Sequence, residues 1–218
     1  MRPVGAVSSM MEQLREVPSR SIRRTPDVCT ILWHDGELAA QSRMTKHLEG
    51  ALVVSPGTHV AVVVSRFNDF LTDHMLQSTI NAYQRLGGNK EDLTVAHVPG
   101  SLELPVTALN LGQSGQYDAI VCLGCVIRGT TDHYEHVCEQ TAKGIREAGL
   151  ETGVPTIFGV VTADTVEQAV NRCGVKMGNQ GEKAMMAAIE MANLMKKIGS
   201  EGDRGQSKTK RQSDETTE

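Results

Sequence analysis

The sequence predicts an α/β fold, a three-layer α/β/α sandwich with a four-stranded parallel sheet at its centre. Short apolar runs alternate along the chain with longer segments of helical periodicity. The runs at residues 60–64 and 119–127 are apolar at nearly every position, which is typical of parallel strands covered by helices on both faces. Aromatic residues make up only 3% of the chain and glycines number 21, a composition that favours compact α/β layers over a β-sandwich.

The first half of the patterned region contains two strand–helix pairs. The first strand, residues 60–64, precedes a helical pattern that begins at Thr72. This helix ends at Gly87, because glycine adopts the left-handed conformation that terminates many helices. The second strand covers residues 93–98, and the next helix begins at Ser101.

The second half repeats this order. The third strand, residues 119–127, leads into a helix from Asp132, where Asp132 and Glu135 have the spacing of a capping pair. The fourth strand, residues 156–161, precedes a helix that starts with a capping box at residues 165–168. Both signals place a helix start directly after a strand.

The last helix opens at Asn179, and residues 48–54 are a candidate for a short additional strand at the sheet edge. An amphipathic helix requires an apolar stripe at helical spacing. Four residues of the last helix form such a stripe: Met185, Ile189, Ala192 and Met195.

The chain is predicted to consist of three parts. Residues 1–45 show no sustained periodicity and are expected to be a poorly ordered N-terminal extension. Residues 46–198 carry the alternating pattern and form the folded domain. Residues 199–218 contain no aliphatic or aromatic side chain that could be buried, so we expect a charged, disordered tail.

Composition limits the possible partners and compartments. The formal net charge of −4 gives no electrostatic footprint for nucleic acid or for an anionic membrane surface. No apolar stretch approaches the ~20 residues of a membrane span, and the N-terminus lacks the apolar region of a secretory signal. The five cysteines are an odd number, and two lie in an apolar strand, so we expect reduced thiols in a cytoplasmic protein.

Polar and aromatic residues follow three of the predicted strands, at the end where open parallel sheets bind ligands. Phe67 follows the first strand and Glu103 the second. Thr130 and Thr131 follow the third strand, just before His133 in the first turn of a helix, where backbone N–H groups favour anions. These residues predict a pocket with an aromatic platform, a carboxylate, a phosphate site and a proton-transfer group. Each of these residues also has a simpler interpretation. Phe67 could cover the core, and Glu103 could only interact with a helix dipole. Thr130 and Thr131 could belong to an ordinary turn, and His133 could be a surface histidine.

A metal site and a nucleotide loop were also considered. Cys122 and Cys125 have zinc-like spacing, but they lie inside a strand and should point to opposite faces, so we predict no metal. The glycine-rich segment 174–181 lacks the Gly-Lys-Ser/Thr ending of a P-loop, which disfavours a nucleoside triphosphate. Arg172, just before this segment, is a candidate anion ligand or a residue of a solvated helix face.

The motif Leu123-Gly-Cys-Val-Ile-Arg-Gly-Thr-Thr-Asp-His-Tyr134 resembles that of the 6,7-dimethyl-8-ribityllumazine synthases of riboflavin biosynthesis. The resemblance implies a flavodoxin-like fold. It also implies the condensation of 5-amino-6-ribitylaminouracil with 3,4-dihydroxy-2-butanone 4-phosphate, without a cofactor. Five blocks carry it in the family's order: residues 65–70, 98–105, 123–134, 155–162 and 181–194.

The resemblance also implies roles for individual residues. Phe67 would stack on the pyrimidine, Ser101 and Glu103 would hold its ribityl chain, and Leu102 would line the pocket. Three residues would meet the pyrimidine edge: Cys125, Val126 and Ile127.

For the second substrate, the resemblance implies that Thr130, Thr131 and Arg172 bind the phosphate and that His133 moves protons. Phe158 would come from a neighbouring subunit, because family members are pentamers, often arranged in shells of sixty subunits. A riboflavin synthase is a possible further partner.

Two positions depart from the family pattern. Leu102 stands where many members have phenylalanine, and Gln180 where many have lysine. Two other hypotheses remain: a relative that binds flavins or lumazines, or forms shells, without turnover, and a flavodoxin-like nucleotide module, which leaves His133 unexplained.

Overall fold

The structure is a computed structural model that describes residues 24–25, 28–29 and 45–214, with side chains from 45 to 200. The chain divides into two compact units, Met1–His47 and Leu48–Glu218. In the first unit, β1 (Arg24–Thr25) pairs antiparallel with β2 (Val28–Cys29). The rest of the expected extension, residues 1–45, lies outside the described residues apart from Thr45.

The second unit contains one sheet with the strand order β4-β3-β5-β6, and every pairing in it is parallel. This confirms the predicted four-stranded parallel sheet. The strands are β3 (Val60–Ser65), β4 (Leu93–Val98), β5 (Ala119–Ile127) and β6 (Thr156–Ala163). The helices are α2 (Asp69–Arg85), α3 (Leu104–Gln113), α4 (His133–Thr152), α5 (Val166–Arg172) and α6 (Gln180–Asp214), with 3₁₀ turns η1 (Lys90–Asp92) and η2 (Ser101–Glu103).

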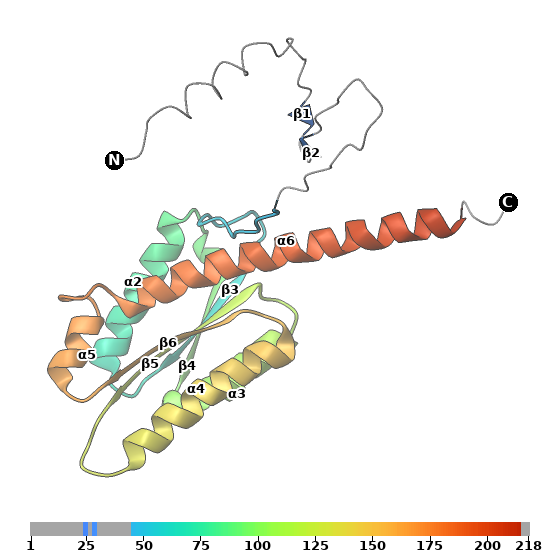
Figure 1. Cartoon of the computed structure of the whole chain (residues 1–218). Coiled ribbons are helices and arrows are strands. Elements are labelled where there is room, and N and C mark those ends of the chain that lie inside the picture. The colour runs from blue at the N-terminus through green and yellow to red at the C-terminus, as the bar shows by residue number, and fades with distance from the viewer. Residues whose placement is uncertain (1–23, 26–27, 30–44, 215–218) are drawn as a thin grey trace, which may run out of the picture. The chain divides into compact units, whose positions relative to one another are not determined.

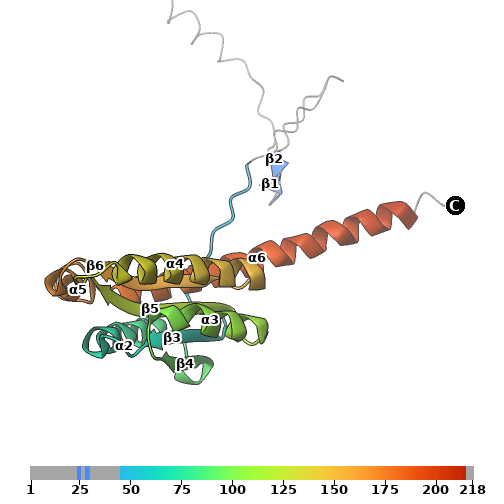
Figure 2. The same ribbon diagram turned by 90° about the horizontal axis from the view of Figure 1, so that it is seen from below.

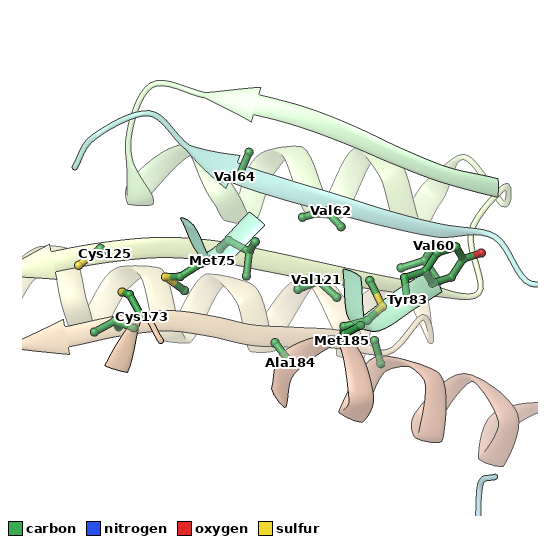
Figure 3. Close-up of a cluster of buried hydrophobic side chains, with 14 of the residues drawn as sticks. Val60, Val62, Val64, Met75, Tyr83, Val121, Cys125, Cys173, Ala184 and Met185 are labelled. Carbon is green, nitrogen blue, oxygen red and sulfur yellow. The ribbon is translucent and has the colours of Figure 1, made fainter. Parts of the chain in front are cut away.

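Helices cover both faces of this sheet, as predicted. Figure 1 shows α2 and α6 on one side of the strands and α3 and α4 on the other, and Figure 2 shows the same layers from below. Successive residues of β3 therefore enter two different cores. Val60, Val62 and Val64 pack with α2, α5 and α6 (Figure 3), whereas Ala61 and Val63 pack with α3 and α4. This explains why the strand is apolar at every position.

The helix starts confirm one predicted cap and correct another. The backbone N–H of Gln168 donates to Thr165 Oγ1 at 3.2 Å, which confirms the cap of α5, although the Gln168 side chain accepts from Asp164 N. The predicted capping pair at α4 is wrong, because Asp132 makes no side-chain cap hydrogen bond. Glu135 instead forms an ion pair with Arg128.

The predicted edge strand at residues 48–54 is also wrong, since this segment has no regular structure. Its backbone is held by α6: Asn193 Nδ2 donates to the carbonyl oxygens of Ala51 at 2.7 Å and Val53 at 2.8 Å. Asn193 is buried, so these bonds satisfy its amide group. They also give the two carbonyl oxygens a hydrogen-bond partner that is not a neighbouring strand.

The expected tail begins inside a helix. Helix α6 continues to Asp214, so residues 199–214 are helical and only residues 215–218 lie outside the described part. Composition alone did not reveal this helix, because residues 199–214 include glycines, serines and a threonine of low helix propensity; they continue a helix that has already nucleated. Within the described residues, no helix has the length and apolarity required to cross a membrane.

Candidate functional site

A cleft of about 300 Å³ lies at the carboxyl ends of β3, β4 and β5, the edge of the sheet where a ligand site was predicted. The loops that follow these three strands form its walls. Its lining residues are Phe67, Gly100, Ser101, Leu102, Glu103, Val126, Ile127, Gly129, Thr131, His133, Tyr134 and Val137.

Phe67 stands at the open side of the cleft with 67% of its surface exposed. Its backbone N–H donates to Pro99 O at 3.1 Å, which joins the loop after β3 to the loop after β4. The next residue, Asn68, has a left-handed backbone with φ of 62°. Its side-chain amide donates to Cys125 O at 2.9 Å and so holds the loop against β5.

Asn68 therefore supports the aromatic platform, although we did not predict this role. The sequence did contain a signal, because asparagine is enriched among non-glycine residues in the left-handed region. An asparagine between a buried strand and a helix is consistent with such a turn, but its partner on β5 depends on the tertiary fold.

The 3₁₀ turn η2 brings the predicted ribityl-binding residues to the cleft. Ser101 is buried, whereas Leu102 and Glu103 are exposed and line the opening. The turn approaches β5 closely because residue 124 is glycine: a Cβ there would lie 2.8 Å from Ser101 Oγ and 3.2 Å from Leu104 Cδ1. Gly124 thus makes room for the turn that presents Ser101 and Glu103.

The turn after β5 leads into the first residue of α4, His133. Thr131 and His133 both line the cleft. The first N–H groups of a helix point away from its body, so an anion beside Thr131 would meet donors and the positive end of the helix dipole. Thr130 belongs to the same exposed turn but does not line the cleft in this structure.

Arg128, which precedes this turn, contacts three side chains. Its Nε donates to Asp164 Oδ1 at 2.8 Å, and its Nη1 donates to Glu135 Oε1. The guanidinium also lies 4.2 Å from the centre of the Tyr134 ring. The hydrogen bond from Arg128 holds the pKa of the Glu135 carboxyl below its ordinary value.

Cys125 does not present its side chain to the cleft. The side chain is fully buried in the core cluster shared with α2, α5 and α6, where Figure 3 shows it beside Cys173. The hydrogen bond to Cys173 and burial raise the pKa of the Cys125 thiol. Cys122 belongs to the other core cluster, so the prediction that Cys122 and Cys125 point to opposite faces is confirmed. Among the described residues, no group of three metal-ligating side chains is present.

Two other predicted residues lie away from the cleft within one chain. Phe158 is on β6 beside Cys122, four residues before the register position of Val126, which corresponds to about 13 Å along a strand. It is 38% exposed. Arg172 is the exposed last residue of α5, which packs on the opposite face of the sheet from α4.

The comparison with known protein families agrees with this geometry. The family model for 6,7-dimethyl-8-ribityllumazine synthase matches residues 57–196. The matched region covers more than half of the chain and includes all four strands of the main sheet and every residue that lines the cleft. The chain therefore belongs to the 6,7-dimethyl-8-ribityllumazine synthase family, transferases that catalyse a step of riboflavin biosynthesis.

Proposed function

We propose that this cleft is where the chain condenses 5-amino-6-ribitylaminouracil with 3,4-dihydroxy-2-butanone 4-phosphate, releasing phosphate and water. The observation that carries the proposal is the convergence of Phe67, η2 and His133 on one cleft. The substrate's amine is the nucleophile, so no serine, cysteine or lysine of the enzyme has to attack. The residues have to position two reactants and move protons.

The pyrimidine would occupy the part of the cleft between Phe67 and the end of β5. The exposed Phe67 ring offers a flat surface for stacking, and Val126 and Ile127 offer apolar contacts to the ring edge. Cys125 would contribute its backbone rather than its thiol, because the thiol faces the opposite core. Ser101 and Glu103 would accept hydrogen bonds from the ribityl hydroxyls.

The phosphate would lie at the N-terminus of α4, beside Thr131 and the neighbouring Thr130. This arrangement would bring the ketone of the same substrate near His133. Attack of the amine gives a carbinolamine, which loses water to an imine. Phosphate then leaves, and the ring closes onto the remaining carbonyl with loss of a second water. An imidazole can both accept and donate a proton, so His133 is suited to take and return the protons of these steps.

The cleft of one chain lacks two of the residues that this reaction is expected to use. Phe158 and Arg172 are both exposed outside it, so a neighbouring subunit would supply them. An aromatic side chain over the opening would limit the access of water to the imine. We therefore propose a homo-oligomer, a pentamer or a sixty-subunit shell of pentamers, that works in the cytoplasm, with riboflavin synthase as a possible partner.

An absorbance assay tests the proposed function. The purified protein is mixed with both substrates, and the lumazine is followed by its visible absorbance together with the release of one phosphate per lumazine. We expect turnover. If the protein binds the pyrimidine or a flavin but forms no lumazine, the alternative of a non-catalytic binding or shell-forming relative replaces the proposal. Gln180, which stands where many members have lysine, is the position that favours this alternative.

A further inference from the structure

We propose that Arg128 is a positioning residue that holds the start of α4, and with it His133 and the phosphate-binding turn, against the junction of β6 and α5. The inference rests on the proposed function of the cleft. It gives Arg128 a role distinct from that of a phosphate ligand, although the residue lies one position before the turn that would bind the anion.

The contacts of Arg128 join three elements. Arg128 directly follows β5, Glu135 is in the first turn of α4, and Asp164 directly follows β6. One guanidinium donates to both carboxylates, with Nε–Oδ1 at 2.8 Å for Asp164 and an Nη1–Oε1 bond to Glu135. The backbone N–H of Arg128 adds a bond of 2.9 Å to Ala163 O. A planar fork of donors holds two carboxylates in a fixed relative position, whereas an ammonium group on a flexible stem holds them less rigidly.

The turn that follows has little packing of its own. A Cβ added at Gly129 would meet no atom within 4 Å, so residue 129 stands in open space. Thr130, Thr131 and Asp132 are exposed, and Asp132 makes no capping bond to α4. Exposed and without a side-chain cap, the turn is held at its two ends, by the contacts of Arg128 at one end and by those of Tyr134 with Thr162 and Cys138 at the other.

Arg128 also reaches the cleft through Tyr134. Its guanidinium lies 4.2 Å from the centre of that ring, and Tyr134 lines the cleft directly after His133. The ring therefore contacts Arg128 and also lines the substrate site. Loss of the guanidinium would remove the ion pair of Glu135 and the cation contact of the Tyr134 ring, while Tyr134 would keep its side-chain hydrogen bonds with Thr162 and Cys138.

The charges around Arg128 argue against a direct role in phosphate binding. Two carboxylates share its single positive charge. A phosphate that approached the remaining N–H donors would be repelled by both of them. The three side chains are also partly exposed, at 42% for Arg128, 50% for Glu135 and 63% for Asp164, so solvent screens the pairs and they contribute little to global stability.

The first test is independent of activity. Amide hydrogen exchange at residues 136–140, whose N–H groups form the first backbone hydrogen bonds of α4, beginning with His136 N to Asp132 O, is compared between the wild type and Arg128→Met without substrate. We expect exchange in this segment to be at least fivefold faster in the variant, with the urea midpoint of unfolding unchanged. Unchanged exchange would overturn the proposal even if the enzyme makes lumazine. Conversely, a wild type that makes no lumazine would refute the proposed function without affecting this result.

The second test uses turnover. Arg128→Met should lower kcat roughly tenfold while KM for the pyrimidine stays within about twofold, because the reacting groups lose their alignment. Arg128→Lys should resemble Arg128→Met, since it keeps the charge but not the fork. A control, Arg85→Met, breaks an exposed ion pair to Glu182 between α2 and α6, away from the cleft, and should leave kcat unchanged.

A triple variant separates positioning from charge balance. Arg128→Met combined with Glu135→Gln and Asp164→Asn removes the bridge but leaves no uncompensated carboxylate. It should remain as slow as Arg128→Met. Wild-type turnover in the triple variant would show that Arg128 only neutralises the two acids. A rise in KM for the phosphate-bearing substrate with kcat intact in Arg128→Met would show that it binds the anion. Either result overturns the proposal.

Discussion

Gly181→Ala should destabilise the enzyme because α6 crosses α2 at this residue. A Cβ at position 181 would lie 2.4 Å from Met75 O, 3.0 Å from the carbonyl carbon of Met75 and 2.5 Å from Thr79 Oγ1. Two of these atoms belong to the backbone of α2, so no side-chain rotation relieves the contact. The Thr79 hydroxyl is also engaged, since it donates to Met75 O at 2.9 Å.

The magnitude follows from two opposing effects. An ordinary carbon–oxygen contact is about 3.4 Å or longer, so the two helices have to separate by roughly 1 Å, and overpacking of this kind costs about 1–3 kcal/mol. Replacing a helical glycine by alanine contributes up to about 1 kcal/mol in the other direction, and less at the second residue of a helix such as α6. We expect a net loss of about 1–2 kcal/mol.

The same substitution later in α6 is the matched control. A Cβ at Gly199 would meet no atom within 4 Å, so only the helix propensity changes, and Gly199→Ala should stabilise by about 0.5–1 kcal/mol. Urea unfolding of the two variants and the wild type, at one protein concentration, gives both differences. Gly181→Ala with a midpoint at or above that of the wild type would refute the close approach of the helices. No gain from Gly199→Ala would contradict the helical conformation at residue 199.

Three further predictions concern the site and the core. His133→Ala should lower turnover roughly ten- to a thousandfold with little change in pyrimidine binding, whereas His136→Ala, one turn away and outside the cleft, should be near wild type in the lumazine assay. Arg172→Ala should weaken binding of the phosphate-bearing substrate by roughly 2–3 kcal/mol more than binding of the pyrimidine, and equal weakening of both would remove its role. Burial raises the pKa of Cys122 from 9.0 and of Tyr83 from 10.0 to about 12, so the native state retains protons that the unfolded chain loses. The stability that these two groups contribute should therefore be fully present below pH 9 and should fall from pH 9 toward 12. Tyr83→Phe should make the urea midpoint of unfolding depend less steeply on pH in this range.

The sheet and most helices could be predicted because burial on both faces leaves a strong pattern in the sequence. Every side chain of residues 60–64 is fully buried, and the run is accordingly apolar throughout. The cap at Thr165 was predictable for a similar reason, since its partner is only three residues away. Features determined within a few residues, or by complete burial, can be recognised in one sequence.

Features that depend on a partner far along the chain could not be predicted. Asn68 finds its acceptor on β5, and Asn193 finds its acceptors more than a hundred residues earlier. The predicted partnership of Asp132 and Glu135 failed because Arg128, stabilised also by Asp164, is a stronger partner for Glu135 than a backbone N–H. The spacing of Asp132 and Glu135 is compatible with a capping pair, but in the folded protein Arg128 lies close enough to bind Glu135 instead.

The proposed site residues fall into two groups, those that line the cleft of one chain and those that lie away from it. This separation is consistent with the proposed homo-oligomer. Strand order places the residues that follow β3, β4 and β5 at one edge, so the cleft could be predicted from topology. Phe158 and Arg172 are remote from it within the chain. The cleft also leaves Phe67 at 67% and Leu102 at 47% exposure, an unusual amount of apolar surface for a site that has to protect an imine from water. A second copy that covers these side chains and contributes its own aromatic and basic residues would resolve both observations. Light scattering tests this directly, because an active monomer would exclude the shared site and an active dimer would exclude the proposed pentamer.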